Sequence, residues 1–425
     1  MKYNLQMAIW VVVANMIGTG IFSSLGYQLL EIHDLFSIVI LWAAGGIISL
    51  CGAYAYSRLA VHMPDAVGEY HYLSRLVHPS VGFLSSWISI TVGFAAPIAL
   101  VLKTMCAYMP AHILGLSGEV WALVALAGIT AVHMKSYSAS EGFHTAITLF
   151  KIAFLILFVA AGLSVSSGQR ISFAPTGYSL DTITSSAFAT SLVYVLYTYS
   201  GWNASTYLAR ELPHPERTLP VSMITGTLLV AVLYIGLNMM FLYAAPIHEL
   251  VVDVKTFEPT DLAVVVAGHI LPSNLVFVMQ GIVCLLLLSS MSSMILAGPR
   301  ITAAIAEQYS VLQLLAKRSS KGIPLYAIGL QTIIAVILFV SNSFEDTLKF
   351  TAMMLTLSSM ATVGSILRIE RKMLTMIASI VFLAANTWVV IHVSQDNPTS
   401  IVWTAVIIFL GIVLYAMLSL SRNRS

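Results

Sequence analysis

The chain has 425 residues, of which 58% are apolar and only 9% are charged, whereas soluble domains carry roughly 25% charged residues. Its 20 basic and 18 acidic residues give a formal net charge of +2, and the uncharged stretches between them reach the ~20 residues that cross a hydrocarbon core as a helix. This composition indicates a multi-pass integral membrane protein, which we expect in the plasma (inner) membrane. It excludes soluble enzymes, nucleic-acid binders and secreted disulfide scaffolds.

Cysteine and histidine give no sign of a metal centre or of catalysis. Cys51, Cys106 and Cys284 all lie in apolar runs, and none of the 11 histidines has the spacing of a metal-ligand pair. No H-E-x-x-H sequence, pair of aspartates or Ser/His arrangement is visible at membrane depth. We therefore expect no cofactor, no metal and no catalytic residue, which disfavours an intramembrane enzyme.

Apolar runs between charges and turn residues predict twelve membrane-spanning helices. The first uncharged run, 3–30, is longer than a signal-peptide core and lacks a convincing cleavage site, so it is assigned to the first span. The longest loop, 245–272, is expected to cap one face with a short helix. The predicted spans are 7–30, 36–58, 81–109, 119–136, 143–166, 183–208, 219–244, 273–305, 324–341, 347–367, 373–393 and 399–421.

The distribution of charge predicts the orientation, because Lys and Arg accumulate on the cytoplasmic side. With both termini in the cytoplasm, only Arg170 and Lys255 among the loop cations fall outside, and most acidic residues fall outside. The predicted cytoplasmic set is Lys2, Arg58, Arg75, Lys135, Arg210, Arg217, Arg300, Lys317, Arg318, Lys321, Arg368, Arg371, Lys372, Arg422 and Arg424.

The first and the sixth predicted spans are both interrupted near their middle. The first contains Gly18-Thr19-Gly20, and each glycine weakens a helix by about 1 kcal/mol relative to alanine. The sixth has a comparable weak point at Ser200-Gly201-Trp202-Asn203. We expect a break in both helices, although small residues that merely let helices pack closely are the alternative interpretation.

Paired breaks in corresponding helices indicate a transporter site built on an inverted repeat. Unwinding frees backbone N–H and C=O groups, which lipid cannot satisfy but a polar solute can. Half-helix N-termini favour a carboxylate and freed carbonyls favour an ammonium, so a zwitterionic amino acid fits both. The predicted fold is an all-α membrane protein with a five-plus-five inverted repeat, comprising 1–166 and 183–367, followed by two helices in 373–421.

At these residues the sequence resembles the amino acid–polyamine–organocation (APC) superfamily, and within it the L-type amino acid transporter branch. Five motifs occur in the family's order and together cover about residues 10–325. They are Gly18-Thr19-Gly20-Ile21-Phe22 in the first span, 63–73 after the second, 82–87 opening the third, Tyr199-Ser200-Gly201-Trp202-Asn203 in the sixth, and 211–220 after it. The resemblance implies the leucine-transporter-like fold, alternating access, and a substrate held between helices one and six.

The resemblance also implies roles for individual residues. The backbone of Thr19, Gly20 and Ile21 would bind the substrate carboxylate. Backbone oxygens near Ile17 and at Tyr197, and Ser200, would receive the amino group. Tyr197 matches the family's aromatic gate, and Trp202 and Asn203 would border the side-chain pocket, with ordinary helix packing as the alternative for Tyr197 and Trp202. The full implied set is Ile17, Gly18, Thr19, Gly20, Ile21, Tyr197, Ser200, Gly201, Trp202 and Asn203.

Lys151 is predicted to lie about 13 Å into a core ~30 Å thick, where a lysine is costly and therefore a candidate functional residue. Lys103 and Lys349 are expected to reach the outer surface. By resemblance, Lys151 occupies the position at which sodium-coupled relatives hold a cation, as a fixed cation or a proton carrier. It would bridge the first and eighth helices, with oxygens from Ser289, Ser290, Ser292 and Ser293 nearby.

No acidic residue falls centrally in a predicted span, so we expect a pocket without a carboxylate. This favours a secondary carrier for neutral L-amino acids, either an exchanger or a proton-linked carrier. A cationic amino acid or polyamine antiporter of the same superfamily remains an alternative. A non-transporting amino-acid sensor is another, but it predicts long cytoplasmic tails, and few residues flank the predicted spans. A channel is disfavoured, because no charged ring or carbonyl filter is visible.

The animal L-type members bond a heavy chain through an extracellular cysteine between helices three and four. Here the corresponding loop, about 110–118, contains no cysteine, and Cys106 lies in the apolar end of the third span. We therefore expect no disulfide-linked heavy chain, no nucleic-acid partner, and a monomer or homodimer in the lipid bilayer.

Overall fold

The computed structural model describes residues 4–109, 115–135, 137–165, 168–169, 172–252, 261–396 and 398–422. Lys2, Arg170, Lys255 and Arg424, on which the predicted orientation partly rests, lie outside these ranges, as does most of the cysteine-free loop, at 110–114. Within the described residues every regular element is a helix. The predicted all-α class is confirmed.

Each predicted span coincides with one helix or with a helix interrupted along its length. The continuous ones are α3 (Leu35–His62), α7 (Gly118–Lys135), α8 (Tyr137–Leu163), α11 (Pro215–Ala244), α14 (Ser273–Ala306), α16 (Leu325–Ser341), α17 (Phe344–Ile366), α18 (Met373–Asp396) and α19 (Pro398–Arg422). The interrupted ones are α1 (Leu5–Met16) with α2 (Gly20–Glu31), α5 (Pro79–Ile88) with the π-helical turn η1 (Ser89–Gly93) and α6 (Ala95–Tyr108), and α10 (Ser186–Thr198) with the 3₁₀ segment η3 (Ala204–Glu211).

Eight of these spans, counted over the described ranges, are long and apolar enough to cross a membrane. The other four predicted spans are helical as well. The helix α10 has only 13 residues because it ends at the predicted break, and α16 has 17. The first turn of α17 carries Glu345 and Asp346, which makes that helix less apolar.

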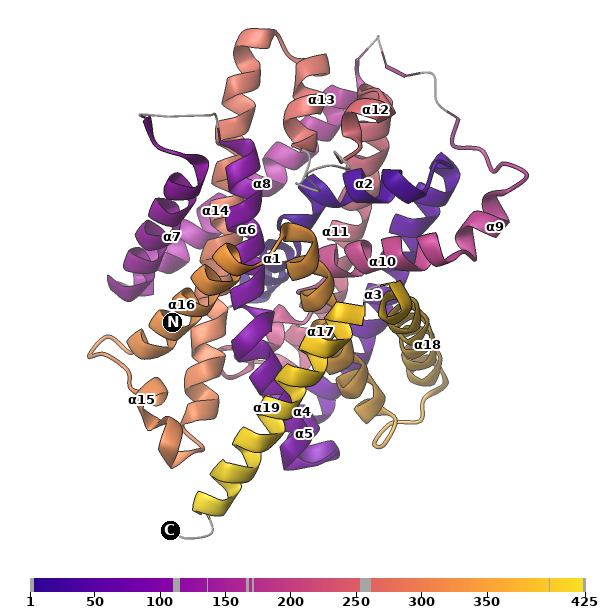
Figure 1. Ribbon diagram of the computed structural model, residues 1–425. Coiled ribbons are helices and arrows are strands. Elements are labelled where there is room, and N and C mark those ends of the chain that lie inside the picture. Colours follow the sequence, from indigo (N-terminus) through magenta and orange to yellow (C-terminus); the bar gives the residue numbers. More distant parts are fainter. Residues whose placement is uncertain are drawn as a thin grey trace.

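Short helices connect the spans at both ends of the molecule. The predicted capping loop holds two of them, α12 (Ile247–Leu250) and α13 (Leu262–Ile270). The others are α4 (Gly68–Leu76), α9 (Ser179–Ile183), η4 (Ser310–Leu312) and α15 (Gln313–Ala316). Figure 1 shows α12 and α13 toward the upper end of the molecule, α9 at its right edge, and α4, α15 and the last turns of α19 toward the lower end. The connections therefore sort to two ends as predicted, and the assignment of one end to the cytoplasm stays a prediction.

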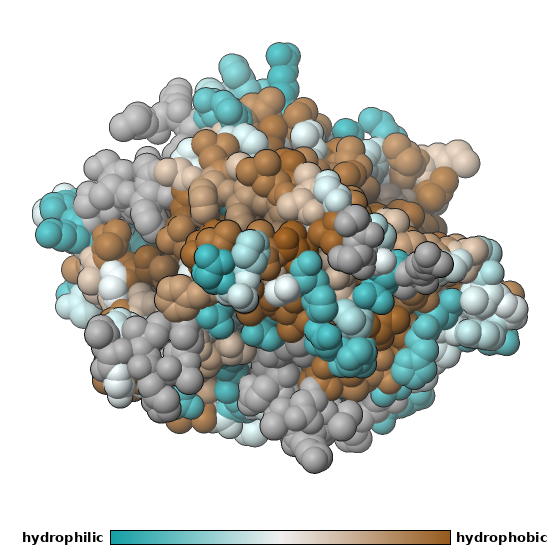
Figure 2. Space-filling view, turned by 90° about the horizontal axis from the view of Figure 1, so that it is seen from above, coloured by the Kyte–Doolittle hydropathy of each residue, from teal (hydrophilic) through white to brown (hydrophobic). Residues whose placement is uncertain are grey.

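The outer helices expose apolar side chains, as a lipid-facing surface requires. Val340 of α16 is 74% exposed, Met373 of α18 is 78% exposed, and Phe409 of α19 is 63% exposed. Seen from the end at which α12 and α13 lie, hydrophilic residues are interspersed among hydrophobic ones (Figure 2). The buried core lies around α1, α3, α10 and α11, which pack against one another in the centre of the molecule (Figure 1).

Candidate functional site

The first span is broken between Met16 and Gly20. The last turn of α1 ends at Met16, Ile17 has an extended backbone (ψ 90°), and α2 begins at Gly20. Gly20 is needed for close packing, because a Cβ there would overlap Thr198 Oγ1 and come within 3.0 Å of Thr198 Cα. The glycines thus end one helix and let the start of the next lie against α10.

The sixth span is broken between Thr198 and Ala204. Gly201 has a φ of +104°, a conformation that L side chains rarely adopt. A Cβ at this position would also lie 3.0 Å from the backbone carbonyl carbon and oxygen of Asn15. The break in the sixth span therefore packs against the last turn of α1, next to the break in the first span, and both breaks lie at the predicted glycine motifs.

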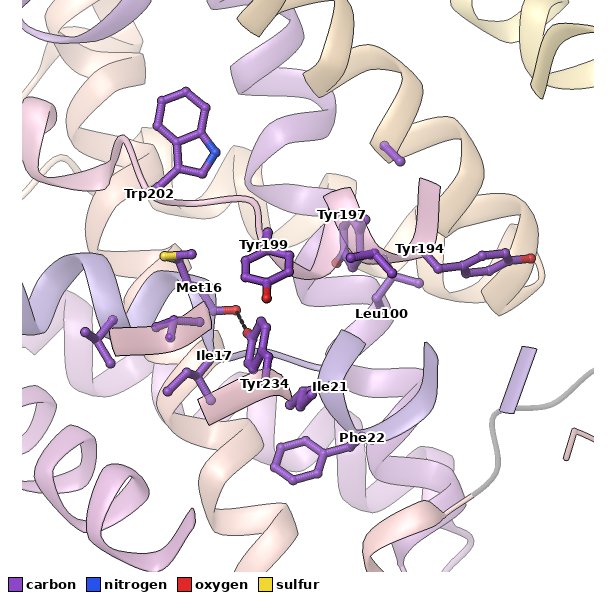
Figure 3. Close-up of a cluster of buried hydrophobic side chains, with 14 of the residues drawn as sticks. Met16, Ile17, Ile21, Phe22, Leu100, Tyr194, Tyr197, Tyr199, Trp202 and Tyr234 are labelled. Carbon is purple, nitrogen blue, oxygen red and sulfur yellow. Dashed lines mark hydrogen bonds between the residues drawn. The ribbon is translucent and has the colours of Figure 1, made fainter. Parts of the chain in front are cut away.

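Tyr234 of α11 links the carbonyl ends of both half-helices. Its hydroxyl lies 2.6 Å from the carbonyl oxygen of Met16, at the end of α1, and 3.2 Å from that of Thr198, at the end of α10. Figure 3 shows Tyr234 beside Met16 and Tyr199. The rings of Tyr199 and Tyr234 lie 5.0 Å apart, and Trp42 packs edge-on against Tyr234. This aromatic group holds the two breaks together from the α3 and α11 side.

A cavity of about 100 Å³ lies between the breaks. Its wall is formed by residues of both breaks and by residues of α4, the third span, α14 and α17. The lining residues are Asn15, Met16, Gly18, Thr19, Gly20, Glu69, Ser89, Gly93, Phe94, Pro97, Val101, Tyr197, Thr198, Ser200, Gly201, Trp202, Asn203, Ala204, Tyr207, Ser290, Met294, Leu355, Ser358 and Ser359. The π-helical turn of the third span is therefore part of the wall, and such turns often occur at functional sites.

Most of the residues predicted from the sequence meet at this cavity. Those that line it are Gly18, Thr19, Gly20, Tyr197, Ser200, Gly201, Trp202, Asn203 and Ser290. Ile17 and Ile21 do not line it, because both side chains are fully buried in the apolar core. A smaller cavity beyond Tyr197 and Trp202, of about 40 Å³, reaches Asn386 of α18.

Lys151 lies behind the cavity rather than in its wall. Its side chain is fully buried, and its Nζ donates to the carbonyl oxygen of Ile17 at 2.7 Å and to Ser290 Oγ at 2.9 Å. Ser290 Oγ also donates to Ile17 O at 2.9 Å. The carbonyl of Ile17, predicted as an acceptor for the substrate amino group, thus already has two protein donors. The predicted bridge from the first to the eighth helix is present.

Only one of the four predicted serines bonds to Lys151. Ser292 Oγ lies 2.9 Å from His133 Nε2 on α7 instead, and Ser293 lines a separate small cavity beside Arg300. Ser289 Oγ, although buried, makes no hydrogen bond within the described residues. The physical reason is the helical period of 3.6 residues, which turns each of these side chains toward a different neighbour.

The expectation of a pocket without a carboxylate is wrong. Glu69, at the start of α4, lines the cavity and is 7% exposed. Tyr56 donates to its Oε1 at 3.2 Å, Tyr207 donates to its Oε2 at 3.0 Å, and Asn203 Nδ2 donates to Oε1. Burial raises the pKa of the Glu69 carboxyl above its ordinary value. The prediction failed because Glu69 comes from a connecting segment and not from a span.

Aromatic rings pack α2, α10 and α17 together on the far side of the breaks from α4. Tyr27 of α2 stacks on Tyr194 of α10 at 5.3 Å and on Phe344 of α17 at 5.9 Å. Tyr194 donates to Glu345 at 3.1 Å, and Lys349 lies 2.6 Å from the same carboxylate. Lys349 was expected at the outer surface but is 15% exposed in this ion pair.

Comparison with known proteins identifies the family. The sequence model of the family described as amino acid permease matches residues 3–420. The chain belongs to the amino acid permease family. The predicted membership of the APC superfamily is therefore confirmed, and the discontinuous helices of this permease are consistent with that fold.

Several curated relatives are similar to this permease at low identity. The b(0,+)-type amino acid transporter 1 of Mus musculus is 26% identical over 250 residues, which cover 56% of this chain and 50% of the relative. The serine/threonine exchanger SteT of Bacillus subtilis (strain 168) is 24% identical over 313 residues, which cover 72% and 68%. The Asc-type amino acid transporter 1 of Mus musculus is 24% identical over 258 residues, covering 59% and 49%. The permease thus spans about half the length of most of these relatives.

Proposed function

We propose that this permease is a secondary active transporter that carries neutral L-amino acids across the plasma membrane by alternating access. The observation that carries the proposal is the cavity between two broken helices, where backbone groups of both breaks line one space. Lipid cannot satisfy such groups, whereas a zwitterion can. Relatives named as amino acid transporters and as an exchanger support the same function.

The two ends of the zwitterion would bind to opposite half-helix ends. The first turn of α2, from Gly20, presents backbone N–H groups that have no acceptor within the helix, and these favour the carboxylate. The carbonyl ends of α1 and α10, at Met16 and Thr198, favour the ammonium. Tyr197, Trp202 and the smaller cavity beyond them would receive the substrate side chain. We assign the two repeats to 1–166 and 183–367, with movement of one against the other opening the site to either side.

Counterflow in proteoliposomes tests this function. Vesicles loaded with an unlabelled amino acid should accumulate the same labelled amino acid, and alanine, serine, threonine and leucine are the first panel. Runs with and without sodium and a pH gradient separate an exchanger from an ion-linked carrier. Absence of counterflow for every amino acid would refute the proposal.

Glu69 favours a second candidate of the same class, a cationic amino acid or polyamine antiporter. A carboxylate in the cavity wall beside Trp202, Tyr207 and Phe94 offers both a counter-charge and aromatic faces to a cation. The carboxylate of Glu69, however, already accepts hydrogen bonds from three uncharged donors. Competition by arginine or putrescine that exceeds competition by serine or leucine would select this second candidate.

Lys151 would act as a fixed cation that replaces sodium at the contact of helices one, five and eight. Its two acceptors, Ile17 O and Ser290 Oγ, belong to the broken helix and to α14, so the ammonium holds the break against α14. Lys151→Ala should therefore slow exchange strongly, since it leaves the Ile17 carbonyl with one donor fewer in a buried place.

The matched control for Lys151→Ala is Lys321→Ala. Lys321 is an exposed lysine in the segment between α15 and α16 and does not line the cavity. Exchange by the control should equal that of the parent protein. If Lys151→Ala also exchanged at the parent rate at every pH measured, a role for the ammonium in transport would be eliminated.

A further inference from the structure

Glu69 is a buried acid without a basic partner. Its carboxylate receives hydrogen bonds from two tyrosine hydroxyls and one amide, those of Tyr56, Tyr207 and Asn203, and all three donors are uncharged. Within the described residues it makes no ion pair. The negative charge of a carboxylate buried in this position is stabilised only by hydrogen bonds from uncharged donors, and otherwise the carboxylate binds a proton.

The charged groups nearby do not neutralise it. Asp65, on the segment before α4, is exposed and is held by Arg75 at 2.8 Å. Tyr72 packs edge-on against Tyr56 at 6.2 Å, and its phenol cannot carry a positive charge. His71 and Arg75 extend from other faces of α4 and are more exposed than Glu69, as is Arg210 at the end of η3. From the η1 turn and α17, only serine hydroxyls and apolar groups line the cavity.

The three donors come from both proposed repeats, which would move against each other in the proposed alternating access. Tyr56 belongs to α3 and Glu69 to α4, both in the first proposed repeat. Asn203 and Tyr207 lie beyond the break of the sixth span, in the second repeat. Any opening that separates η3 from α4 therefore breaks the bonds from Asn203 and Tyr207 and admits water to the carboxylate.

We propose that Glu69 is the proton-binding group of this carrier, so that one proton moves with each amino acid toward the side on which η3 leaves α4. The proposal rests on the proposed transport function. While the cluster is assembled, Glu69 faces the cavity and takes its proton from there. When η3 moves away, the carboxyl is hydrated and releases that proton to the water entering between η3 and α4. By the predicted orientation, this is the cytoplasmic side.

The sign of the coupling follows from burial. The assembled cluster favours the neutral carboxyl, because burial raises its pKa above the ordinary 4.5. A hydrated glutamate has a pKa of about 4.3. Opening therefore releases a proton at pH values between the hydrated and the buried pKa. Low pH favours the assembled cluster and high pH favours the open one.

The test uses the full chain in proteoliposomes that contain a pH-sensitive dye, with a labelled amino acid already shown to undergo counterflow. The measured quantity is the ratio of protons to amino acid molecules entering the vesicle. The parent protein should acidify the lumen when the amino acid is added. Glu69→Gln should lose this acidification per amino acid moved, because the amide cannot titrate. Asp65→Asn, an exposed acid of the same connection, should keep the parent ratio.

The outcomes separate the two proposals. Absence of counterflow refutes transport itself. Counterflow without proton entry in the parent protein, or an unchanged ratio in Glu69→Gln, overturns the role of Glu69 and leaves transport standing. A Glu69→Gln effect confined to arginine or lysine as substrate would instead assign Glu69 to cation binding and would also overturn it.

A second variant covers the case in which Glu69→Gln does not fold. Tyr207→Phe keeps the carboxyl but removes a donor that favours its charged form. The midpoint of the pH dependence of the proton ratio should then move upward by about one pH unit. An unchanged midpoint, with the parent showing proton entry, would also contradict the role of Glu69.

Discussion

Gly201 meets two backbone requirements at the same place. Its positive φ forms the break in the sixth span, and its missing Cβ leaves room for the backbone of Asn15, which would lie only 3.0 Å from a Cβ at this position. Two other glycines serve as references, one with the positive φ alone and one with neither requirement. Gly322 has a positive φ of 79° with nothing near its Cβ position, and Gly128 has an open Cβ position within α7.

Gly201→Ala should lower the thermal stability of the detergent-solubilised protein and abolish exchange. The strained φ costs on the order of 1–3 kcal/mol, and the collision with Asn15 adds to it. Gly322→Ala should show the strain alone and keep exchange. Gly128→Ala should be neutral or stabilising by roughly 0.5–1 kcal/mol, as in an ordinary helix interior. Equal losses of stability in Gly201→Ala and Gly322→Ala would show that the close approach to Asn15 carries no energy.

At the residue scale, the sequence predicted backbone features better than side-chain partners. The breaks at Gly20 and Gly201 were predictable because glycine has a local effect on the helix. The four-serine cluster was not resolvable, since only the helix rotation decides that Ser290 and not Ser292 meets Lys151. Glu69 was missed because its burial depends on Asn203 and Tyr207, more than 130 residues away in the chain.

Among the elements, the end of α3 is fixed to the connection between α17 and α18 by one carboxylate. Glu370, 5% exposed, accepts from Arg58 at 2.8 Å, from Thr375 at 2.8 Å, and lies 2.7 Å from His62. The Arg58 guanidinium lowers the pKa of Glu370 to about 2. Because the pKa is lowered on folding, this contact stabilises the fold above the ordinary value of 4.5 and is lost as the pH falls from there toward 2.

Glu370→Gln should therefore destabilise the protein most at neutral pH. We expect a loss of about 2–3 kcal/mol, because the Arg58 charge is left partly buried without its partner. The difference from the parent protein should shrink as the pH is lowered below 4.5, measured by thermal unfolding in detergent across pH.

The control is Glu307→Gln, which removes an exposed pair with Arg318 and should cost less than about 1 kcal/mol at any pH. A Glu370→Gln difference that stayed constant down to low pH would contradict the assigned cause. Such long-range pairs are also the part of the element packing that no local sequence pattern reveals. Apolar periodicity and length predicted where the spans lie, but not the π-helical turn at Ser89–Gly93.

At the scale of the whole molecule, the connections lie at two ends, and the distribution of basic residues predicts which end is cytoplasmic. The segment before α9 and the segment after α15 belong to opposite ends (Figure 1). Ala174 and Ser320 are exposed residues of these two segments. They provide a direct measurement of orientation, which the fold alone does not determine.

Ala174→Cys should react with a membrane-impermeant maleimide added to intact cells, whereas Ser320→Cys should react only after the membrane is made permeable. The background protein has Cys51, Cys106 and Cys284 replaced, and without an introduced cysteine it should remain unlabelled. The reverse pattern would invert the topology. It would also place the opening beside Glu69 on the outer side of the membrane.

The hydroxyl of Tyr234 offers one hydrogen to two carbonyl oxygens, those of Met16 and Thr198, and both residues line the cavity. The hydroxyl has a single hydrogen, so it donates to one of these oxygens at a time. Under the proposed function, a substrate ammonium, which carries three hydrogens, would donate to the other oxygen while Tyr234 keeps its bond. Tyr234 would thus let the site accept the ammonium without giving up its contact with the two breaks.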